Sequence, residues 1–261
     1  MDVLLPRVCV VCGRKLNTNE EHLCLYCRAE MPMTHFWERS HNEMADRFNG
    51  LVESGFAESG LIESRLAADV VDAAGLSGCL AGGQFERYAY AVALFFYDGS
   101  GEYRRITQRL KYGADLSIGR EFGSALGRRI QNAPHLKDVD VVIPVPLHWT
   151  RRWMRGYNQA EVIASAVAEV LSVEERNDVL KRCRRTRTQT KVNPKKKAEN
   201  VRGAFMADGS CLDVGSYRHL LLVDDVFTSG ATLYNCFLAL RAELPVSVRI
   251  SVATLAFVGG V

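Results

Sequence analysis

Two adjacent carboxylates at the end of an apolar run are the clearest chemical signal in the chain. Asp224 and Asp225 follow the segment 219–223, which reads HLLLV. The hydroxyl groups of a ribose, or a Mg²⁺ ion shared with phosphates, would give such a pair a function. The pair therefore marks a candidate site for a phosphorylated ligand.

A short run of small and hydroxylated residues follows this acid pair, at the start of a predicted helix. Its members are Thr228, Ser229, Gly230, Ala231 and Thr232. Their backbone N–H groups and hydroxyls can surround a phosphate with help from the helix dipole, and glycine allows a close approach of the backbone. In the simpler alternative, Thr228 or Ser229 only caps the helix. A cap does not explain the acids upstream, so we interpret the run as a phosphate loop.

Four of the eight cysteines stand near the N-terminus as two CxxC pairs, Cys9 with Cys12 and Cys24 with Cys27. Two such pairs can supply the four thiolates of a tetrahedral zinc site. Two disulfides or a redox-active CxxC are the alternatives. The N-terminus lacks the basic start and long apolar stretch of a secretory signal, so we expect a cytoplasmic protein, in which disulfides are rare. A redox motif needs only one pair, and we therefore predict structural zinc.

Positive charge is concentrated in one segment. The formal net charge is +3, yet residues 181–202 alone carry +9, which leaves −6 for the remainder of the chain. The segment has few apolar residues, so it cannot bury itself and is expected to be mobile. This segregation of charge points to an anionic partner of the segment, although a merely solvated loop is the alternative.

Apolar runs alternate with helical periodicity along the rest of the chain. Strands are expected at 88–97, 139–145, 201–206, 219–226 and 246–256, and helices at 101–112, 117–132, 157–171 and 230–243. Near-continuous apolar strands between helices predict an α/β fold with a parallel sheet covered on both faces. Ligands of such sheets bind beyond the carboxyl ends of the strands, so the loops after 145 and 223 are expected to form the site.

The composition fits one large domain with a small appendage, since 48% of the 261 residues are hydrophobic and 24% are charged. No apolar run approaches the length of about 18 residues that a membrane-spanning helix needs. We predict a zinc-binding module at 1–33, a linker or insertion at 34–84 and the main domain at 85–261. Residues 51–83 show no recognisable chemistry. Phe36 and Trp37 are expected either to pack a joint between the domains or to remain on the surface for base stacking.

The four-cysteine module, the apolar strand with its paired acids and the TSGAT run together resemble the ComF family of competence-associated proteins. Further matching stretches are LKYG (110–113), IPVPLHWTRRWMRGYNQ (143–159), RTRTQT (185–190) and ENVRGAF (199–205). The resemblance covers most of 1–33 and 85–261. It implies a type I phosphoribosyltransferase-like parallel sheet flanked by helices, plus the small N-terminal zinc module.

The resemblance also implies a ligand, phosphoribosyl pyrophosphate (PRPP), together with Mg²⁺. Asp224 and Asp225 would contact the 2′ and 3′ hydroxyls of the ribose. The residues at 228–232 would hold the 5′-phosphate. The acid pair and the phosphate loop would thus bind two neighbouring parts of one molecule.

Basic side chains are expected to meet the pyrophosphate of this ligand. Arg152 and Arg155 lie in the predicted loop after the second strand, and their guanidinium groups suit phosphate oxygens. Lys111 either reaches a phosphate or only closes its own helix. In type I phosphoribosyltransferases, which the chain resembles, a flexible loop in the position of 181–202 folds over the active site. Arg187 and Gln189 match that loop best.

The resemblance leaves two functions open. In the first, the chain handles nucleic acid during DNA uptake, binds PRPP and binds single-stranded DNA through 181–202, with a DNA-uptake helicase as a candidate partner. In the second, it is a catalytic phosphoribosyltransferase of nucleotide salvage or a related pathway, in which a nitrogen nucleophile displaces pyrophosphate and Mg²⁺ neutralises the leaving group. The charge of 181–202 exceeds what one pyrophosphate requires, which favours the first function.

Overall fold

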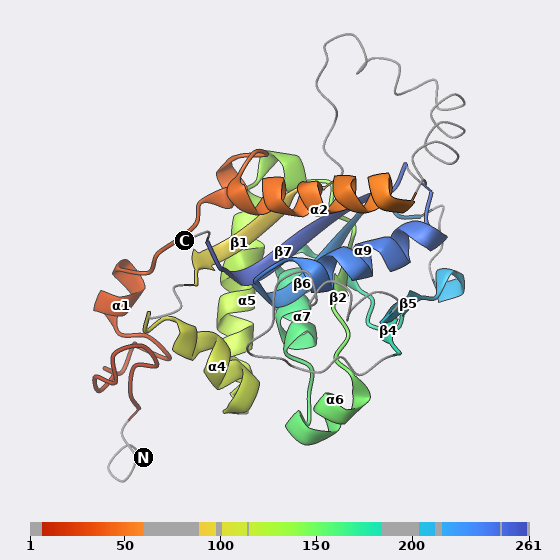
Figure 1. The fold of residues 1–261 in the computed structure, drawn as a ribbon. Helices are drawn as coiled ribbons and strands as arrows, with labels where there is room; N and C mark the ends of the chain where they lie inside the picture. The colour runs from red at the N-terminus through yellow and green to blue at the C-terminus, as the bar shows by residue number, and fades with distance from the viewer. Residues whose placement is uncertain are drawn as a thin grey trace.

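The computed structural model describes residues 7–59, 89–97, 101–113, 115–183, 204–211, 216–245 and 247–259. Its centre is a five-stranded parallel sheet with the strand order β1–β7–β6–β2–β3 (Figure 1). Its strands are β1 (Ala91–Phe96), β2 (Val141–Pro144), β3 (Glu174–Glu175), β6 (His219–Phe227) and β7 (Arg249–Phe257). A separate antiparallel pair consists of β4 (Leu180–Arg182) and β5 (Phe205–Ala207). The predicted α/β fold with a parallel sheet is confirmed.

Helices cover both faces of the sheet. α5 (Leu116–Gln131) and α7 (Gln159–Leu171) pack against each other on one face, and α2 (Glu43–Ser59) and α9 (Ala231–Glu243) lie on the other (Figure 1). Right-handed crossovers explain this division, because the chain crosses the sheet in one direction from β1 to β2 to β3 and in the opposite direction from β6 to β7. Burial on both faces explains why the central strands are continuous apolar runs.

Most of the predicted elements lie within three residues of the observed ones. The exception is the strand expected at 201–206, which begins at Phe205 and whose first three residues lie outside the described part of the chain. The remaining helices are α1 (Leu25–Ala29), α4 (Arg104–Tyr112) and α6 (Trp149–Arg155), with short 3-10 helices at Phe36–Glu38, Pro134–Leu136 and Gly209–Cys211. Within the described residues, no helix has the length and apolar character needed to cross a membrane.

The segment after β2 is helical, whereas the proline-rich IPVP motif predicts a loop there. His148 caps the first turn of α6, because its Nδ1 accepts a hydrogen bond from the N–H of Thr150 at 3.3 Å. Gly156 ends the helix with φ at +80°, a conformation that favours glycine. The two caps explain how a helix forms between the prolines and the start of α7.

Helix α2 lies in the segment predicted to be a linker or insertion. Its Phe48 is fully buried against Phe237 of α9, with the ring centroids 5.7 Å apart. Upstream, Phe36 packs edge-on against Phe96 and Phe257 at the ends of two strands. Of the two expectations for Phe36, packing is therefore correct. These side chains join the core of the main sheet, and the domain limits at 33 and 84 stay a prediction.

Candidate ligand site at the end of the sheet

The acid pair lies beside the point where β2 ends. Pairing between β2 and β6 stops at Pro144 and Val223, and β6 then continues along β7 to Phe227. Asp224 and Asp225 occupy the first two positions of this extension, and Asp225 is only 8% exposed. The two carboxyl groups therefore lie at the carboxyl edge of the sheet, on the side that β2 leaves open.

Lys111, near the end of α4, forms an ion pair with Asp225. The Nζ and Oδ2 atoms are 2.8 Å apart, and only 27% and 11% of the two side chains are exposed. Burial is the largest single effect and lowers the pKa of Lys111, but the charge and hydrogen bond of Asp225 and the charge of Asp224 together raise it overall. The helix ends at Tyr112, so Lys111 does stand in its last turn. Its side chain, however, acts as the counter-ion of Asp225.

Asp224 differs from its neighbour. Burial and the negative charge of Asp225 raise the pKa of Asp224 to about 7, although the Asp225 N–H and the charges of Lys111 and Arg182 oppose the rise. The N–H of Asp225 donates to Asp224 Oδ1 at 2.8 Å. The site thus combines one acid that a lysine neutralises with one whose ionisation costs free energy, an arrangement typical of functional sites.

The predicted phosphate loop turns into α9 at Gly230. This glycine has φ at +76°, and a Cβ there would lie 2.6 Å from Phe227 Cζ and 2.9 Å from Leu51 Cδ1. Only glycine fits this position. Gly230 is itself the N-cap, and no described side chain caps the first turn of the helix. The simple capping role considered for Thr228 or Ser229 is therefore not the one that the structure shows.

Arg47 of α2 supports the phosphate loop, and the sequence analysis missed it. Its Nη2 donates to the carbonyl of Thr228 at 3.2 Å and its Nη1 to the carbonyl of Val258 at 2.7 Å. The guanidinium also lies over the ring of Phe257, 5.2 Å from the centroid. The helical spacing of apolar residues in α2 was the signal that could have revealed this helix and its arginine.

The predicted basic residues after β2 differ in position. The side chain of Arg152 is 58% exposed and pairs with Glu161 of α7 at 2.8 Å. Arg155 lies over the ring of Tyr112 at 5.2 Å, and its charge acts on the pKa of Lys111. The structure therefore brings Arg155 close to the acid pair, whereas Arg152 is engaged by another helix.

Arg182 is a second residue that the sequence analysis missed. It belongs to β4, where burial and the charge of Arg151 lower its pKa and the charge of Asp224 raises it. Arg182 is therefore within electrostatic reach of the acid pair. Its position could not be read from the sequence, because β4 is a short strand of mixed composition. Arg187 and Gln189, further along the chain, lie outside the described residues, and their roles stay a prediction.

The four cysteines come together in the N-terminal module. The sulfur atoms of Cys9, Cys12, Cys24 and Cys27 all lie within 4.8 Å of one another. Cys12 Sγ and Cys24 Sγ are 3.7 Å apart, close to the separation of about 3.8 Å for two sulfurs bound at about 2.3 Å to a tetrahedral zinc. Burial raises the pKa of Cys9, but hydrogen bonds from backbone N–H groups lower it to about 7, whereas burial and hydrogen bonds with the other three cysteines raise the pKa of Cys27. The cluster is compatible with a zinc site.

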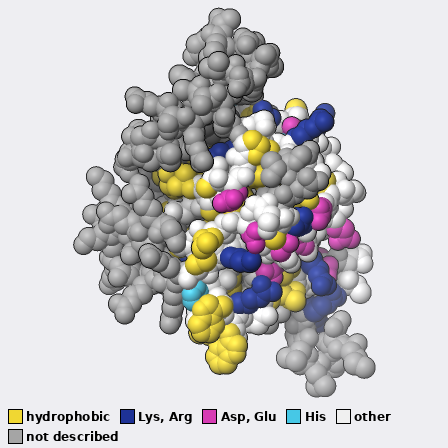
Figure 2. All heavy atoms as spheres, turned by 90° about the vertical axis from the view of Figure 1, so that its right-hand side faces the viewer, with side chains coloured by type: hydrophobic (Ala, Val, Ile, Leu, Met, Phe, Trp, Pro, Cys, Tyr) yellow, Lys and Arg dark blue, Asp and Glu magenta, His cyan; other side chains and the backbone are white. Residues whose placement is uncertain are grey.

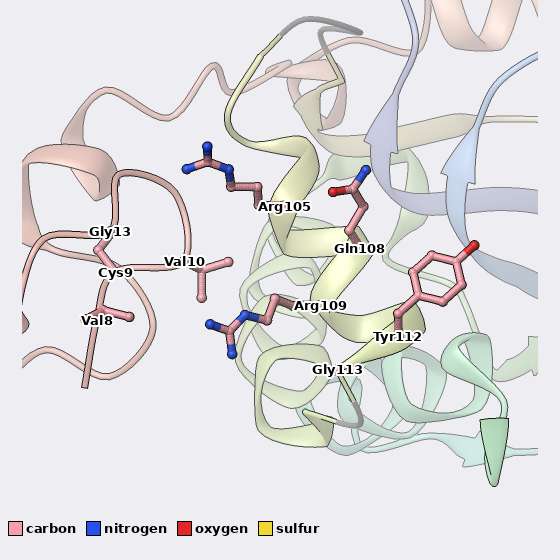
Figure 3. Close-up of a pocket in the computed structure, with 9 residues that line it drawn as sticks. All are labelled: Val8, Cys9, Val10, Gly13, Arg105, Gln108, Arg109, Tyr112 and Gly113. Carbon is pink, nitrogen blue, oxygen red and sulfur yellow. The ribbon is translucent and has the colours of Figure 1, made fainter. Parts of the chain in front are cut away.

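The module docks on α4, with a pocket of about 590 Å³ between them (Figure 3). Two arginines of α4 extend across this pocket toward the module (Figure 3). One of them, Arg105, donates a hydrogen bond to the carbonyl of Val11, and Tyr103 donates one to the carbonyl of Cys27 at 2.9 Å. Helix α4 thus carries docking contacts at its start and Lys111 of the ligand site at its end.

Fold and site together define an α/β protein with a five-stranded parallel sheet, a candidate ligand site at the carboxyl edge of that sheet and an N-terminal four-cysteine module. No protein-family model matches the chain. Among solved structures, glutamine PRPP amidotransferase from B. subtilis in complex with ADP and GMP is 18% identical and has a TM-score of 0.36. The match covers 56% of this chain and 30% of that chain.

The relatives found by sequence are more informative. Competence protein F of Haemophilus influenzae is 34% identical over 139 residues, which are 52% of this chain and 60% of that protein. DNA utilization protein YhgH of Escherichia coli O157:H7 is 31% identical over 120 residues, 43% of this chain and 51% of that protein. The chain thus spans about half the length of these curated relatives. The chain is thus similar to these two proteins, and this similarity agrees with the resemblance of its motifs to the ComF family.

Proposed function

We propose that the chain binds PRPP with Mg²⁺ at the edge of its sheet and handles single-stranded DNA during DNA uptake. One observation carries the ligand part of this proposal. The acid pair at 224–225 precedes, by two residues, a loop that enters α9 through a glycine with positive φ. Carboxylates and helical N–H groups then face adjoining parts of one ligand.

The chemistry of the two halves matches a phosphorylated ribose. Ribose hydroxyls can donate hydrogen bonds to Asp224 and Asp225, and carboxylate acceptors form strong hydrogen bonds of this kind. The N–H groups of the loop 228–232 and of the first turn of α9 suit a phosphate dianion, with which the helix dipole interacts favourably. Lys111, held on Asp225, adds a cation beside the position of the ligand.

The positive side chains around the acid pair suit the pyrophosphate. Arg155 and Arg182 act electrostatically on Lys111 and Asp224. Arg152 would have to leave Glu161 to join them, so we assign it a weaker contribution. Mg²⁺ would neutralise the pyrophosphate oxygens when it is bound with the ligand.

The DNA part of the proposal is supported by the relatives and by charge. One relative is named a competence protein and the other a DNA utilization protein. The +9 charge of 181–202 suits the phosphates of a nucleic acid, whose binding releases counterions. A DNA-uptake helicase is the protein partner that we propose for this role.

The second candidate is a catalytic phosphoribosyltransferase of nucleotide salvage or a related pathway. The complete acid pair and phosphate loop favour it, because a protein that only binds DNA needs neither. In that case a nitrogen nucleophile attacks the anomeric carbon and pyrophosphate leaves. Release of pyrophosphate from PRPP in the presence of any nucleobase would establish this activity. The absence of release with all bases tested would leave binding as the function.

Calorimetric titration with PRPP, with and without Mg²⁺, tests the ligand site. Asn at both 224 and 225 keeps the shape but removes the charge, and loss of a charged hydrogen-bond partner costs about 1.5–3 kcal/mol, so affinity should fall at least about tenfold. Thr232→Val should act in the same direction, more mildly. Glu243→Gln removes one negative charge at the opposite end of α9 and is the matched control. Equal binding by the double variant and the unmodified protein would refute the site.

A further inference from the structure

Helix α6 presents two tryptophans to solvent. Trp149 is 71% exposed and Trp153 is 84% exposed, and Met154 beside them is 66% exposed. Large apolar side chains gathered on a surface mark a contact site. Figure 2 draws the face of the molecule that lies on the right-hand side in Figure 1. Large hydrophobic side chains project from the lower part of that face, next to Lys and Arg side chains.

The spacing of the two tryptophans suits a single strand. Residues four apart lie on the same side of a helix, with their Cβ atoms about 5–6 Å apart. Bases of a fully stacked strand are about 3.4 Å apart. Rings one helical turn apart therefore match neighbouring bases of a strand that is stretched out. Indole rings stack on any base, so this contact does not depend on sequence.

The charge of α6 indicates an anionic occupant. The helix contains Arg151, Arg152 and Arg155 and no acidic residue. The charge of Arg151 also acts on Arg182. Arg182 is the second residue of the +9 segment 181–202, so α6 lies close to the start of that segment. Exposed aromatic rings with arginines beside them on the same helix are the two components of a surface that binds single-stranded nucleic acid.

We propose that α6 is a stacking platform for single-stranded DNA, in which Trp149 and Trp153 each receive a base and the neighbouring arginines contact the phosphates. This inference rests on the proposed function, because it names where the DNA partner is held. Tyr112, which is 77% exposed and lies under the guanidinium of Arg155, extends the aromatic surface toward the acid pair. A protein partner that buries the same rings is the competing occupant.

Intrinsic fluorescence gives a direct test. The chain has three tryptophans, and Trp37 is only 5% exposed, so stacked bases can quench only Trp149 and Trp153. Titration with an oligothymidylate of about twelve nucleotides, within the site sizes of single-strand binders, should quench this fluorescence. Replacement of both exposed tryptophans by Leu should weaken binding about 30-fold, measured by anisotropy. Replacement by Phe should restore most of the affinity, because a ring is again present.

A strand of the same length without bases separates stacking from charge. Its binding should be equal for the unmodified protein and the double Leu variant, whereas replacement of the lysines at 195–197 by Ala should weaken both strands alike. Equal binding of oligothymidylate by the double Leu variant and the unmodified protein would refute the platform and leave the proposed DNA function standing. The platform is also refuted if the double Leu change weakens binding of the strand without bases by the same factor as binding of oligothymidylate. If the unmodified protein binds neither strand, the DNA part of the proposed function fails, and PRPP calorimetry still decides the other part.

Discussion

Replacement of Asp224 by Asn is expected to stabilise the protein at neutral pH, although Asp224 belongs to the candidate site. Burial and the charge of Asp225 raise its pKa from 3.8 to about 7. The folded state therefore holds this proton more tightly than the unfolded state. The resulting stability is fully present below the unfolded pKa and is lost as the pH rises from about 4 toward 7. At pH 8 the carboxylate destabilises the fold, and a neutral asparagine of the same shape removes that cost.

The size of the gain in stability follows from the unfolded and folded pKa values of Asp224. The difference between them corresponds to about 4 kcal/mol at most. Because Asp224 is partly exposed, water reduces the penalty, and we expect a gain of about 1–2 kcal/mol at pH 8. In thermal unfolding this corresponds to about 2–8 °C for a chain of this size. The gain should shrink to a small fraction of this value at pH 4, where the folded state is protonated and the unfolded state, with its pKa of 3.8, is already close to half protonated.

Asp225→Asn is the matched control, because the same isosteric change at the next residue should have the opposite sign. It leaves the Lys111 ammonium without its partner in a half-buried place, and loss of a charged hydrogen bond costs about 1.5–3 kcal/mol. Thermal unfolding in Mg²⁺-free buffer at pH 4 and pH 8 measures both variants. The electrostatic reasoning is refuted if both changes shift the midpoint in the same direction at pH 8. It is also refuted if the Asp224→Asn gain does not depend on pH.

Three further outcomes are expected. Ser at Cys9 and Cys24 should abolish zinc binding, because each CxxC pair loses one thiolate, and elemental analysis that still finds zinc would contradict this. Ala at the lysines 195–197 should reduce the slope of log affinity for single-stranded DNA against log salt by about 2, at about 0.7 for each phosphate contact. An unchanged slope would place the DNA contacts elsewhere. Arg47→Met should weaken PRPP binding about tenfold in calorimetry, because the loop at Thr228 loses its hydrogen bond from the guanidinium. Arg47→Lys should give an affinity between those of the unmodified protein and the Met variant. Unchanged affinity of the Met variant would show that Arg47 does not position the loop.

The elements that the sequence predicts well are those whose pattern comes from burial. β6 and β7 lie inside the sheet, so residues 220–223 and 250–257 are buried and form mostly apolar runs that the sequence displays clearly. α6 could not be found in this way, because it buries none of its residues and its large apolar side chains face solvent instead of the core. α2 was missed for another reason. Its apolar residues Met44, Phe48 and Val52 do have helical spacing, but this signal is masked because the segment merges into 51–83, whose glycine, alanine, serine and glutamate are typical of linkers.

The same distinction applies to the site. The acid pair, the phosphate loop and the cysteine pairs are contiguous or closely spaced motifs, so the sequence displays them directly. The contact between Arg47 and Thr228 joins residues 181 positions apart, and the ion pair between Lys111 and Asp225 also joins distant segments. Such contacts depend on the crossovers of the sheet and on helix packing. No local sequence pattern reveals these long-range contacts.

Helix α4 has only nine residues, yet it is attached at both ends. Arg105 binds the cysteine module through the carbonyl of Val11, and Lys111 binds Asp225. The two attachments are six residues, or about 9 Å, apart along one rigid helix. If zinc and the phosphorylated ligand bind as we propose, loss of zinc would release the first attachment and let Lys111 move away from Asp225. By reciprocity, the factor by which bound zinc raises ligand affinity is also the factor by which bound ligand raises zinc affinity. A cell that depletes zinc would then also weaken the binding of this protein to that ligand.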